Sequence, residues 1–312
     1  MRAFKASIAG MLFALMSCND KNLNSEITSI KTIDQIPSAS GLEIIKDQIF
    51  IVGDNSPWLF KLNSDFEIMD KIELHREFAQ KFNIIPKPVK PDFEALTSYT
   101  ESGKTRLMIF GSGSLREVRD QLIIVDPQTH ETNQYSLTAL YLHLIKTADL
   151  KEEDLNIEAA VTSNKHLYLF NRGKNISFKC LIQDLLDYLN TETSIPDFEI
   201  TAYELPKLGG IEAGFSGACI NKEQTKILFT AAVENTENWI ADGEVTGSFI
   251  GYIDLKNAAV RTTQLTVANK PLLAKVESVA IYNESDNIYK LLLVTDNDGK
   301  ASQLITADLD DN

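Results

Sequence analysis

The sequence has few of the residues that build disulfide scaffolds, zinc sites or nucleic-acid surfaces. Of its 312 residues, three are Cys and four are His, and acidic residues outnumber basic ones by 44 to 30. The resulting charge of −14 gives no attraction to phosphate backbones, so we expect no nucleic-acid partner. With 44% hydrophobic and 24% charged residues, the composition excludes a disordered or collagen-like chain and is typical of a globular protein with a large core.

Familiar catalytic and cofactor motifs are also missing from the sequence. The four His never fall at zinc-ligand spacing, and none lies near a Ser or Cys in a nucleophile-like setting. The chain has no GxSxG turn, phosphate-binding loop or dinucleotide fingerprint, and the GSGS at residues 111–114 opens no predicted helix. Covalent hydrolase chemistry therefore has no support in the sequence.

The N-terminus predicts export. Arg2 and Lys5 precede an apolar run at residues 8–16, which is shorter than the roughly 18 residues that span a bilayer and is typical of a signal peptide. The residues Leu15-Met16-Ser17-Cys18 resemble the bacterial lipobox, in which cleavage precedes a lipidated Cys. We expect a signal peptide at 1–17, a polar tether at 18–25 and one domain at 26–312, anchored by lipid on Cys18 to a bacterial membrane in the cell envelope, outside the cytoplasm. An ordinary signal peptide is the alternative.

The two remaining cysteines, Cys180 and Cys219, both lie in apolar stretches. Export would permit a disulfide between them, but spacing alone does not decide the matter. We favour two free buried thiols.

A short pattern of an apolar residue, Glu and a third, usually small residue occurs five times. The copies are Leu42-Glu43-Ile44, Phe93-Glu94-Ala95, Ile157-Glu158-Ala159, Ile211-Glu212-Ala213 and Val276-Glu277-Ser278. Successive glutamates are 51, 64, 54 and 65 residues apart, near the length of a propeller blade. Each copy is followed by an apolar strand that ends in a polar turn, such as QIFIVGDNS or RLMIFGSGS.

Each unit has the β-branched and aromatic residues of four strands, except that the fifth unit lacks one. Residues 26–34 form an unpaired strand before the first unit, and pairing it with the last blade would close a ring. We therefore predict an all-β, five-bladed propeller. One alternative fold is a β-sandwich, and another is a propeller with a sixth blade around residues 78–91, although these residues read as a loop. Within the third unit, residues 180–189 can form a short helix instead of a strand.

The start of each inner strand and the end of the second strand lie on one face of a propeller, so the repeated acidic residues should surround one mouth of the channel. The candidate metal ligands there are Glu43, Glu94, Glu158, Glu212, Glu277, Asp54 and Asp296. Oxygen ligands without thiolate or imidazole favour Ca²⁺. The alternative is structural: each glutamate accepts backbone N–H bonds from the next blade, with no metal.

Four cations can be placed at the same mouth: Arg172, Lys174, Arg116 and Arg119. They would hold a phosphate or carboxylate of a substrate. The alternative is that they are solvated loop residues.

Three segments carry a family resemblance: SGLEIIKDQIFIVGDNSPWLFKLN, KPDFEAL, and VESVAIY followed by VTDNDG. They are similar to the phytase-like and gluconolactonase-like calcium propellers. The resemblance implies acidic loop residues that bind calcium at the channel mouth, with the substrate above the ion.

Two functions remain open. The first, which we favour, is a monomeric lipid-anchored propeller that binds a protein or glycan on its loop face. The second is a calcium-dependent hydrolase of a phosphoester, ester or lactone, with one unliganded carboxylate as general base. Bound calcium would distinguish them.

Overall fold

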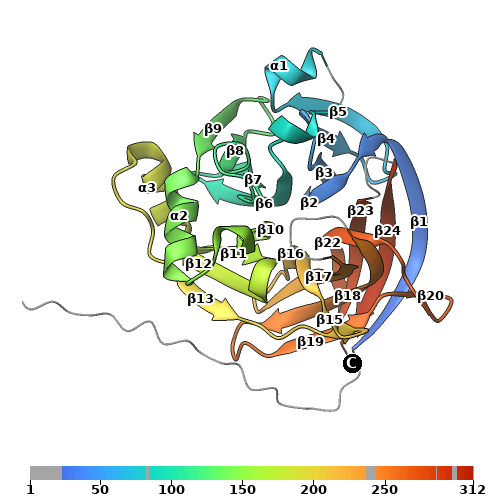
Figure 1. The fold of residues 1–312 in the computed structure, drawn as a ribbon. Helices are drawn as coiled ribbons and strands as arrows, with labels where there is room; N and C mark the ends of the chain where they lie inside the picture. The colour runs from blue at the N-terminus through green and yellow to red at the C-terminus, as the bar shows by residue number, and fades with distance from the viewer. Residues whose placement is uncertain (1–22, 82–83, 237–242, 286, 297–300, 312) are drawn as a thin grey trace, which may run out of the picture.

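The computed structural model describes residues 23–81, 84–236, 243–285, 287–296 and 301–311. Five four-stranded antiparallel sheets surround a central axis as the blades of a propeller (Figure 1). This confirms the predicted all-β fold and its five blades. The lipidation candidate Cys18 lies outside the described residues.

Each blade contains four strands in meander order. The first blade has β2 (Ala39–Ile45), β3 (Gln48–Gly53), β4 (Trp58–Leu62) and β5 (Ile68–Glu73). The second has β6 (Phe93–Glu101), β7 (Lys104–Gly111), β8 (Gln121–Val125) and β9 (Thr132–Ser136). The third has β10 (Ile157–Thr162), β11 (His166–Asn171), β12 (Ile176–Leu181) and β13 (Glu199–Ala202). The fourth has β16 (Gly214–Ile220), β17 (Lys226–Asn235), β18 (Glu244–Asp254) and β19 (Val260–Gln264).

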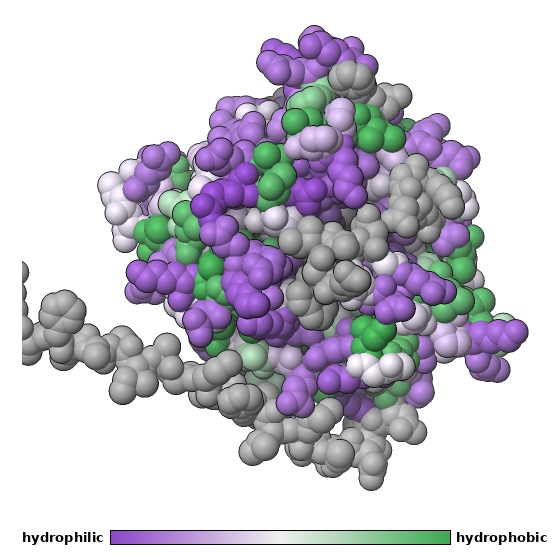
Figure 2. Space-filling model, in the orientation of Figure 1, coloured by the Kyte–Doolittle hydropathy of each residue, from purple (hydrophilic) through white to green (hydrophobic). Residues whose placement is uncertain are grey.

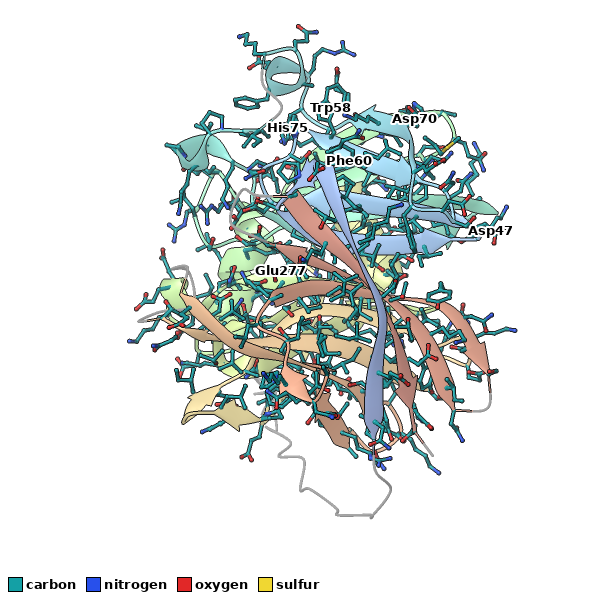
Figure 3. The ribbon with its side chains drawn as sticks, turned by 90° about the vertical axis from the view of Figure 1, so that its right-hand side faces the viewer. Asp47, Trp58, Phe60, Asp70, His75 and Glu277 are labelled. Carbon is teal, nitrogen blue, oxygen red and sulfur yellow. The ribbon has the colours of Figure 1, made fainter. Side chains whose placement is uncertain are left out.

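The fifth blade is built from both ends of the described chain. It contains β22 (Lys275–Ser285), β23 (Ile288–Asp296), β24 (Ala301–Asp310) and, outermost, β1 (Asn24–Pro37). The β1–β24 pairing runs from Asn24 opposite Asp310 to Pro37 opposite Ala301, and Figure 3 shows β1 along the edge of this blade. The predicted ring closure is therefore confirmed.

The inner strands β2, β6, β10, β16 and β22 contact the inner strands of neighbouring blades. The second strand of each blade is covered on both faces, so β3, β7, β11, β17 and β23 are mostly buried. This explains why they have continuous apolar sequences instead of alternating ones. Between the third and fourth blades, the Phe215 ring packs 5.0 Å from the Phe170 ring and 5.1 Å from the Phe229 ring.

Helices and small hairpins fill the connections. They are α1 (Arg76–Ala79), α2 (Thr138–Thr147), α3 (Ile182–Thr191), the 3-10 turns η1 (Lys87–Val89), η2 (Glu152–Asp154) and η3 (Gly173–Asn175), and the hairpins β14 (Lys207–Leu208) with β15 (Ile211–Glu212) and β20 (Thr266–Val267) with β21 (Lys270–Pro271). The helix α3 confirms the helical alternative for residues 180–189, whereas α2 was not predicted. Cys180 and Cys219 are free, as favoured from the sequence.

The described surface is mixed in character. Hydrophilic side chains predominate on the face of the propeller that Figure 2 shows, and exposed large apolar side chains such as Met69 and Leu273 are scattered. Within the described part of the chain, no helix combines the length and apolar character that crossing a bilayer requires.

Candidate functional site

Every inner strand has a β-bulge near its start. The bulged residue is Ser40 in β2, Glu94 in β6, Glu158 in β10, Ser216 in β16 and Glu277 in β22. A bulge leaves one residue outside the ladder and redirects its side chain. The five equivalent positions of the ring thus hold three glutamates and two serines.

The small residue after each bulge permits close packing of the inner strands. A methyl group at Gly41 would lie 2.8 Å from Leu96 Cβ, and one at Gly217 would lie 2.4 Å from Ser278 Cα. Both distances are too short for carbon atoms in contact. The repeat therefore consists of an apolar residue, a Glu or Ser at the bulge, and a small residue where adjacent blades meet.

The structure brings together five of the seven candidate metal ligands and separates two. Glu94, Glu158 and Glu277 lie near the ends of β3 and β23, where Asp54 and Asp296 are found.

Glu43 lies three residues beyond the bulge of β2, toward the opposite end of the channel. The β2–β3 turn is at that end, and Asp47 marks it in Figure 3. Glu212 lies in β15, where it accepts a hydrogen bond from the Leu205 N–H and pairs with Lys207 at 3.9 Å.

We call the assembled group the charged mouth. Its acidic members are Asp54, Asp92, Glu94, Glu158, Glu234, Glu277 and Asp296, and its cations are Lys90, Arg119, Arg172 and Lys275. Among these residues, carboxyl groups exceed cations by seven to four.

One half of the charged mouth is organised by Lys90. Its ammonium pairs with Asp54 and lies 2.7 Å from Asp92 Oδ1. Asp92 Oδ2 also accepts from Arg119 Nη1 at 2.8 Å and from the Ser112 hydroxyl at 2.6 Å. The Ser114 hydroxyl donates to the same oxygen at 3.2 Å, so Asp92 is held by two cations and two hydroxyls.

The other half is organised by Arg172 and Lys275. Arg172 lies 3.6 Å from Glu158 and 3.3 Å from Glu234, and its side chain is 4% exposed. Lys275 Nζ lies 3.3 Å from Glu234 and 2.7 Å from Glu277. These contacts join the second strand of the fourth blade to the inner strands of the third and fifth.

Burial shifts the protonation of these groups. Desolvation, together with neighbouring carboxylates, raises the pKa of Glu94 well above its usual range. Burial likewise raises the pKa of Glu158 and Glu277 although cations lie beside them, and it raises the pKa of Asp54 to about 6. For Asp92, burial opposes ionisation, but Lys90 and Arg119 outweigh it and lower the pKa. Burial therefore favours the protonated form of the other four carboxyl groups, and a bound cation would favour the ionised form.

Several buried oxygens of the charged mouth are unused. Asp54 Oδ1, Glu158 Oε2 and Glu277 Oε2 have no hydrogen-bond partner within the described part of the chain. Glu277 is 1% exposed and Glu158 is 4% exposed, so their free oxygens are not satisfied by bulk water. Buried acceptors without donors are costly and point to a ligand, an ion or a proton.

A metal could use part of this group. Asp54, Asp92 and Glu94 each offer a carboxylate oxygen, and the three atoms lie within 4.8 Å of one another. Oxygen ligands of this kind suit Ca²⁺. Because Lys90 already pairs with two of these carboxylates, calcium would have to displace its ammonium group.

Contacts between blades at the bulges are made by hydroxyl groups. The Ser40 hydroxyl donates to the Phe93 carbonyl of the next blade, and the Ser216 hydroxyl donates to the Val276 carbonyl at 2.6 Å. Glu158 instead accepts from the side chain of Asn156 at 2.7 Å. At two ring positions a serine thus links adjacent blades by donating to a carbonyl, which differs from the role considered for glutamate, the acceptance of backbone N–H bonds.

The predicted anion-binding cations are dispersed. Arg172 is enclosed by carboxylates, whereas Arg116 is 45% exposed and pairs with Glu152, and Lys174 is 52% exposed and lies 3.1 Å from Asp154. Arg119 does join the charged mouth.

Four members of the charged mouth were not predicted from the sequence as site residues or ion-pair partners: Lys90, Asp92, Glu234 and Lys275. A signal for two of them was present: Asp92 and Lys275 stand two residues before a bulged glutamate, a spacing that places side chains near one another on a strand.

The chain belongs to DUF6929, a family of unknown function whose model matches residues 35–309. No curated protein is similar to it in sequence.

Several solved structures resemble the chain at low identity. Glutaminyl cyclase of Myxococcus xanthus has a TM-score of 0.48 and 12% identity, over 92% of this chain and 96% of that one. Hydrazine synthase of Kuenenia stuttgartiensis has a TM-score of 0.41 and 11% identity over 84% of this chain, which spans only 57% of the length of that chain. A Bacteroides fragilis protein described as exported has a TM-score of 0.39 and 9% identity, over 91% of this chain and 94% of that one.

Proposed function

We propose that this protein is an exported, lipid-anchored binding protein whose propeller holds a cationic ligand at the charged mouth. The observation that carries the proposal is that, within the described part of the chain, the buried oxygens Asp54 Oδ1, Glu158 Oε2 and Glu277 Oε2 have no hydrogen-bond partner. A ligand ammonium or guanidinium group would supply the missing donors and charge. An anionic ligand would meet carboxylates that already enclose Arg172.

Proton release provides a test specific to this site. A cation that enters the charged mouth favours the ionised form of Glu94, whose pKa burial and neighbouring carboxylates raise well above its usual range, so binding should expel protons. Calorimetric titration of the mature protein in detergent with 1,4-diaminobutane, in buffers of different ionisation enthalpy, measures this release. We expect saturable binding with a net release of protons at pH 7.

Matched variants locate the binding site. Glu277→Gln removes a carboxylate of the charged mouth and should weaken 1,4-diaminobutane binding at least tenfold, whereas Glu212→Gln, in β15 outside it, should leave binding unchanged. Binding without proton release, equal binding by wild type and Glu277→Gln, or no saturable binding would overturn the proposal.

A second candidate function is calcium-dependent hydrolysis, which the spacing of Asp54, Asp92 and Glu94 favours. Calcium would polarise a substrate oxygen, and a carboxylate of the charged mouth outside these three ligands would be the candidate general base. This function requires saturable Ca²⁺ binding and calcium-dependent cleavage of p-nitrophenyl phosphate or acetate that is lost in Asp54→Asn. Absence of both activities with Ca²⁺ present would eliminate it.

The membrane anchor has its own test. If Cys18 accepts the lipid, Cys18→Ser should abolish palmitate incorporation and leave the precursor uncleaved, because the thiol is the site of attachment. The measurement is metabolic labelling with palmitate. Equal labelling of the variant and the wild type would show that the N-terminus is an ordinary signal peptide.

A further inference from the structure

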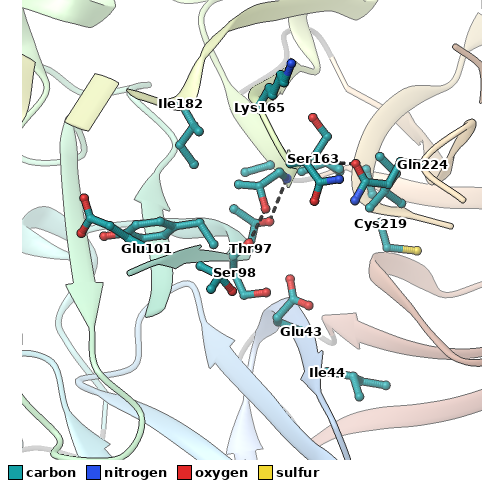
Figure 4. Close-up of a pocket in the computed structure, with 18 of the residues that line it drawn as sticks. Glu43, Ile44, Thr97, Ser98, Glu101, Ser163, Lys165, Ile182, Cys219 and Gln224 are labelled. Carbon is teal, nitrogen blue, oxygen red and sulfur yellow. Dashed lines mark hydrogen bonds between the residues drawn. The ribbon is translucent and has the colours of Figure 1, made fainter. Parts of the chain in front are cut away.

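A second cavity lies at the opposite end of the channel from the charged mouth. Its volume is about 810 Å³, and inner strands of all five blades contribute to its lining together with α3. This volume is in the range of cavities that hold small organic molecules. We call it the Glu43 pocket (Figure 4).

The Glu43 carboxyl group points into this cavity from β2, as Figure 4 shows. Donor groups near it, the Ile44 N–H and the N–H and hydroxyl of Ser98, lower its pKa, but burial outweighs them and raises it to about 7. Among the described residues no Lys, Arg or His forms an ion pair with it. In contrast to every ion-paired carboxylate of the charged mouth, Glu43 is held by neutral donors alone.

Besides Glu43, the titratable residues that line the Glu43 pocket in the described part of the chain are Tyr99, Glu101, Lys165 and Cys219. Glu101 and Lys165, of opposite charge, are exposed residues of turns at the outer ends of β6 and β10. Cys219 of β16 lies beside Glu43, and burial raises the pKa of its thiol, so it stays neutral. The charge that a ligand meets inside the pocket is therefore set by Glu43.

One wall of the Glu43 pocket is apolar. Leu181 and Ile182, at the junction of β12 and α3, line the cavity with Leu186 of the same helix. Leu181 is 45% exposed, so its apolar side chain is available to a ligand in the cavity. An acid at the base and an apolar wall at the side together fit an amphipathic ligand.

We propose that the Glu43 pocket binds an organic monoamine with an apolar body, such as the N-terminus of a short apolar peptide. The protonated amine lies at the Glu43 carboxylate, and the apolar body covers Leu181 and Ile182. This site is separate from the charged mouth and does not depend on the function proposed there.

The probe is Leu-Leu-amide, which has one protonated amine and a neutral C-terminus. N-acetyl-Leu-Leu-amide is the matched control, because acetylation removes the charge and retains the apolar side chains. In calorimetric titration of the mature protein at pH 8, we expect saturable binding of one Leu-Leu-amide per chain, and binding of the acetylated peptide at least tenfold weaker.

Three variants separate this site from others. Glu43→Gln should weaken Leu-Leu-amide binding at least tenfold, Leu181→Ser should weaken it severalfold through the loss of apolar contact, and Glu277→Gln, in the charged mouth, should leave it unchanged. Leu181 is exposed, so its variant keeps the test decisive if Glu43→Gln fails to fold.

The proposal is overturned if wild-type protein shows no saturable binding or if acetylation does not weaken it. The proposal is also overturned if Glu43→Gln binds Leu-Leu-amide as tightly as wild type does. If Glu43→Gln cannot be purified, equal affinity of Leu181→Ser and wild type would overturn it. An equal loss in Glu277→Gln would place the peptide at the charged mouth instead.

Discussion

The two ends of the channel surround their carboxyl groups with different partners. At the charged mouth, Arg172 and Lys275 connect Glu158, Glu234 and Glu277 through ion pairs. At the other end, Glu43 has only N–H and O–H donors. A charged partner compensates for the desolvation of a carboxylate more strongly than neutral donors do. We therefore expect that removal of a cation at the charged mouth destabilises the protein. Removal of the negative charge of Glu43 should instead stabilise it.

The largest effect should come from Arg172→Met. This change keeps the volume of the side chain but leaves Glu158 and Glu234 without their guanidinium partner, and unpairing a buried ion pair costs about 3 to 5 kcal/mol. Urea unfolding at pH 7.5 measures the loss. At pH 5 the loss should shrink, because Glu158, whose pKa burial already raises, takes up a proton.

The control for this prediction is Arg172→Lys, which retains the positive charge and should lose less stability than Arg172→Met. Arg172 also packs closely against Gly214, because a methyl group added at Gly214 would lie 2.5 Å from Arg172 Cγ. If the two variants unfold at the same urea concentration, this packing and not the charge determines the contribution of Arg172 to stability.

A gain of stability is expected at the other end of the channel from Glu43→Gln. Burial raises the pKa of Glu43 from 4.5 to about 7, so the folded protein binds a proton more tightly than the unfolded chain does. This tighter proton binding stabilises the folded protein fully below pH 4.5. The stabilisation is lost as the pH rises through 7, which lowers the free energy of unfolding by at most about 3 kcal/mol. The variant should therefore unfold at higher urea than wild type at pH 8.5.

Two further measurements make the Glu43 prediction decisive. At pH 4 Glu43→Gln and wild type should have nearly equal stability, because the wild-type carboxyl is then protonated in both states. The control Glu212→Gln, which removes a carboxylate outside both sites, should show no such gain at pH 8.5. A variant that is less stable than wild type at pH 8.5 would mean that the hydrogen bonds from Ser98 outweigh desolvation.

Most of the fold could be predicted because burial leaves a record in the sequence. The second strand of each blade is covered on both faces, so segments such as Gln48–Gly53 and Lys104–Gly111 are apolar runs bounded by turns. The unpaired strand at the N-terminus and the missing strand at the end indicated ring closure. The helix α2 was missed, although Leu140, Tyr141 and Leu144 have the spacing of one buried helix face.

The site was only partly predictable because bulge positions depend on pairing between strands. The search fixed on glutamate and therefore selected Glu43 and Glu212, while the bulges of those blades carry Ser40 and Ser216. Both serines precede a Gly, and this small residue was the more reliable marker. The ion pair of Arg172 with Glu234 joins two different blades, and sequence spacing contains no record of that contact.

The smallest effect should come from a buried contact that carries no charge. Ser216, fully buried at a bulge of the same ring, donates from its hydroxyl to the Val276 carbonyl at 2.6 Å. Ser216→Ala removes this donor and should cost roughly 1 to 2 kcal/mol. Because a hydroxyl does not titrate in this range, urea unfolding should give the same loss at pH 5 and pH 8. A loss that changes with pH would mean that Ser216 acts by positioning Glu277, and the distinction between neutral and charged contacts around the channel would then fail.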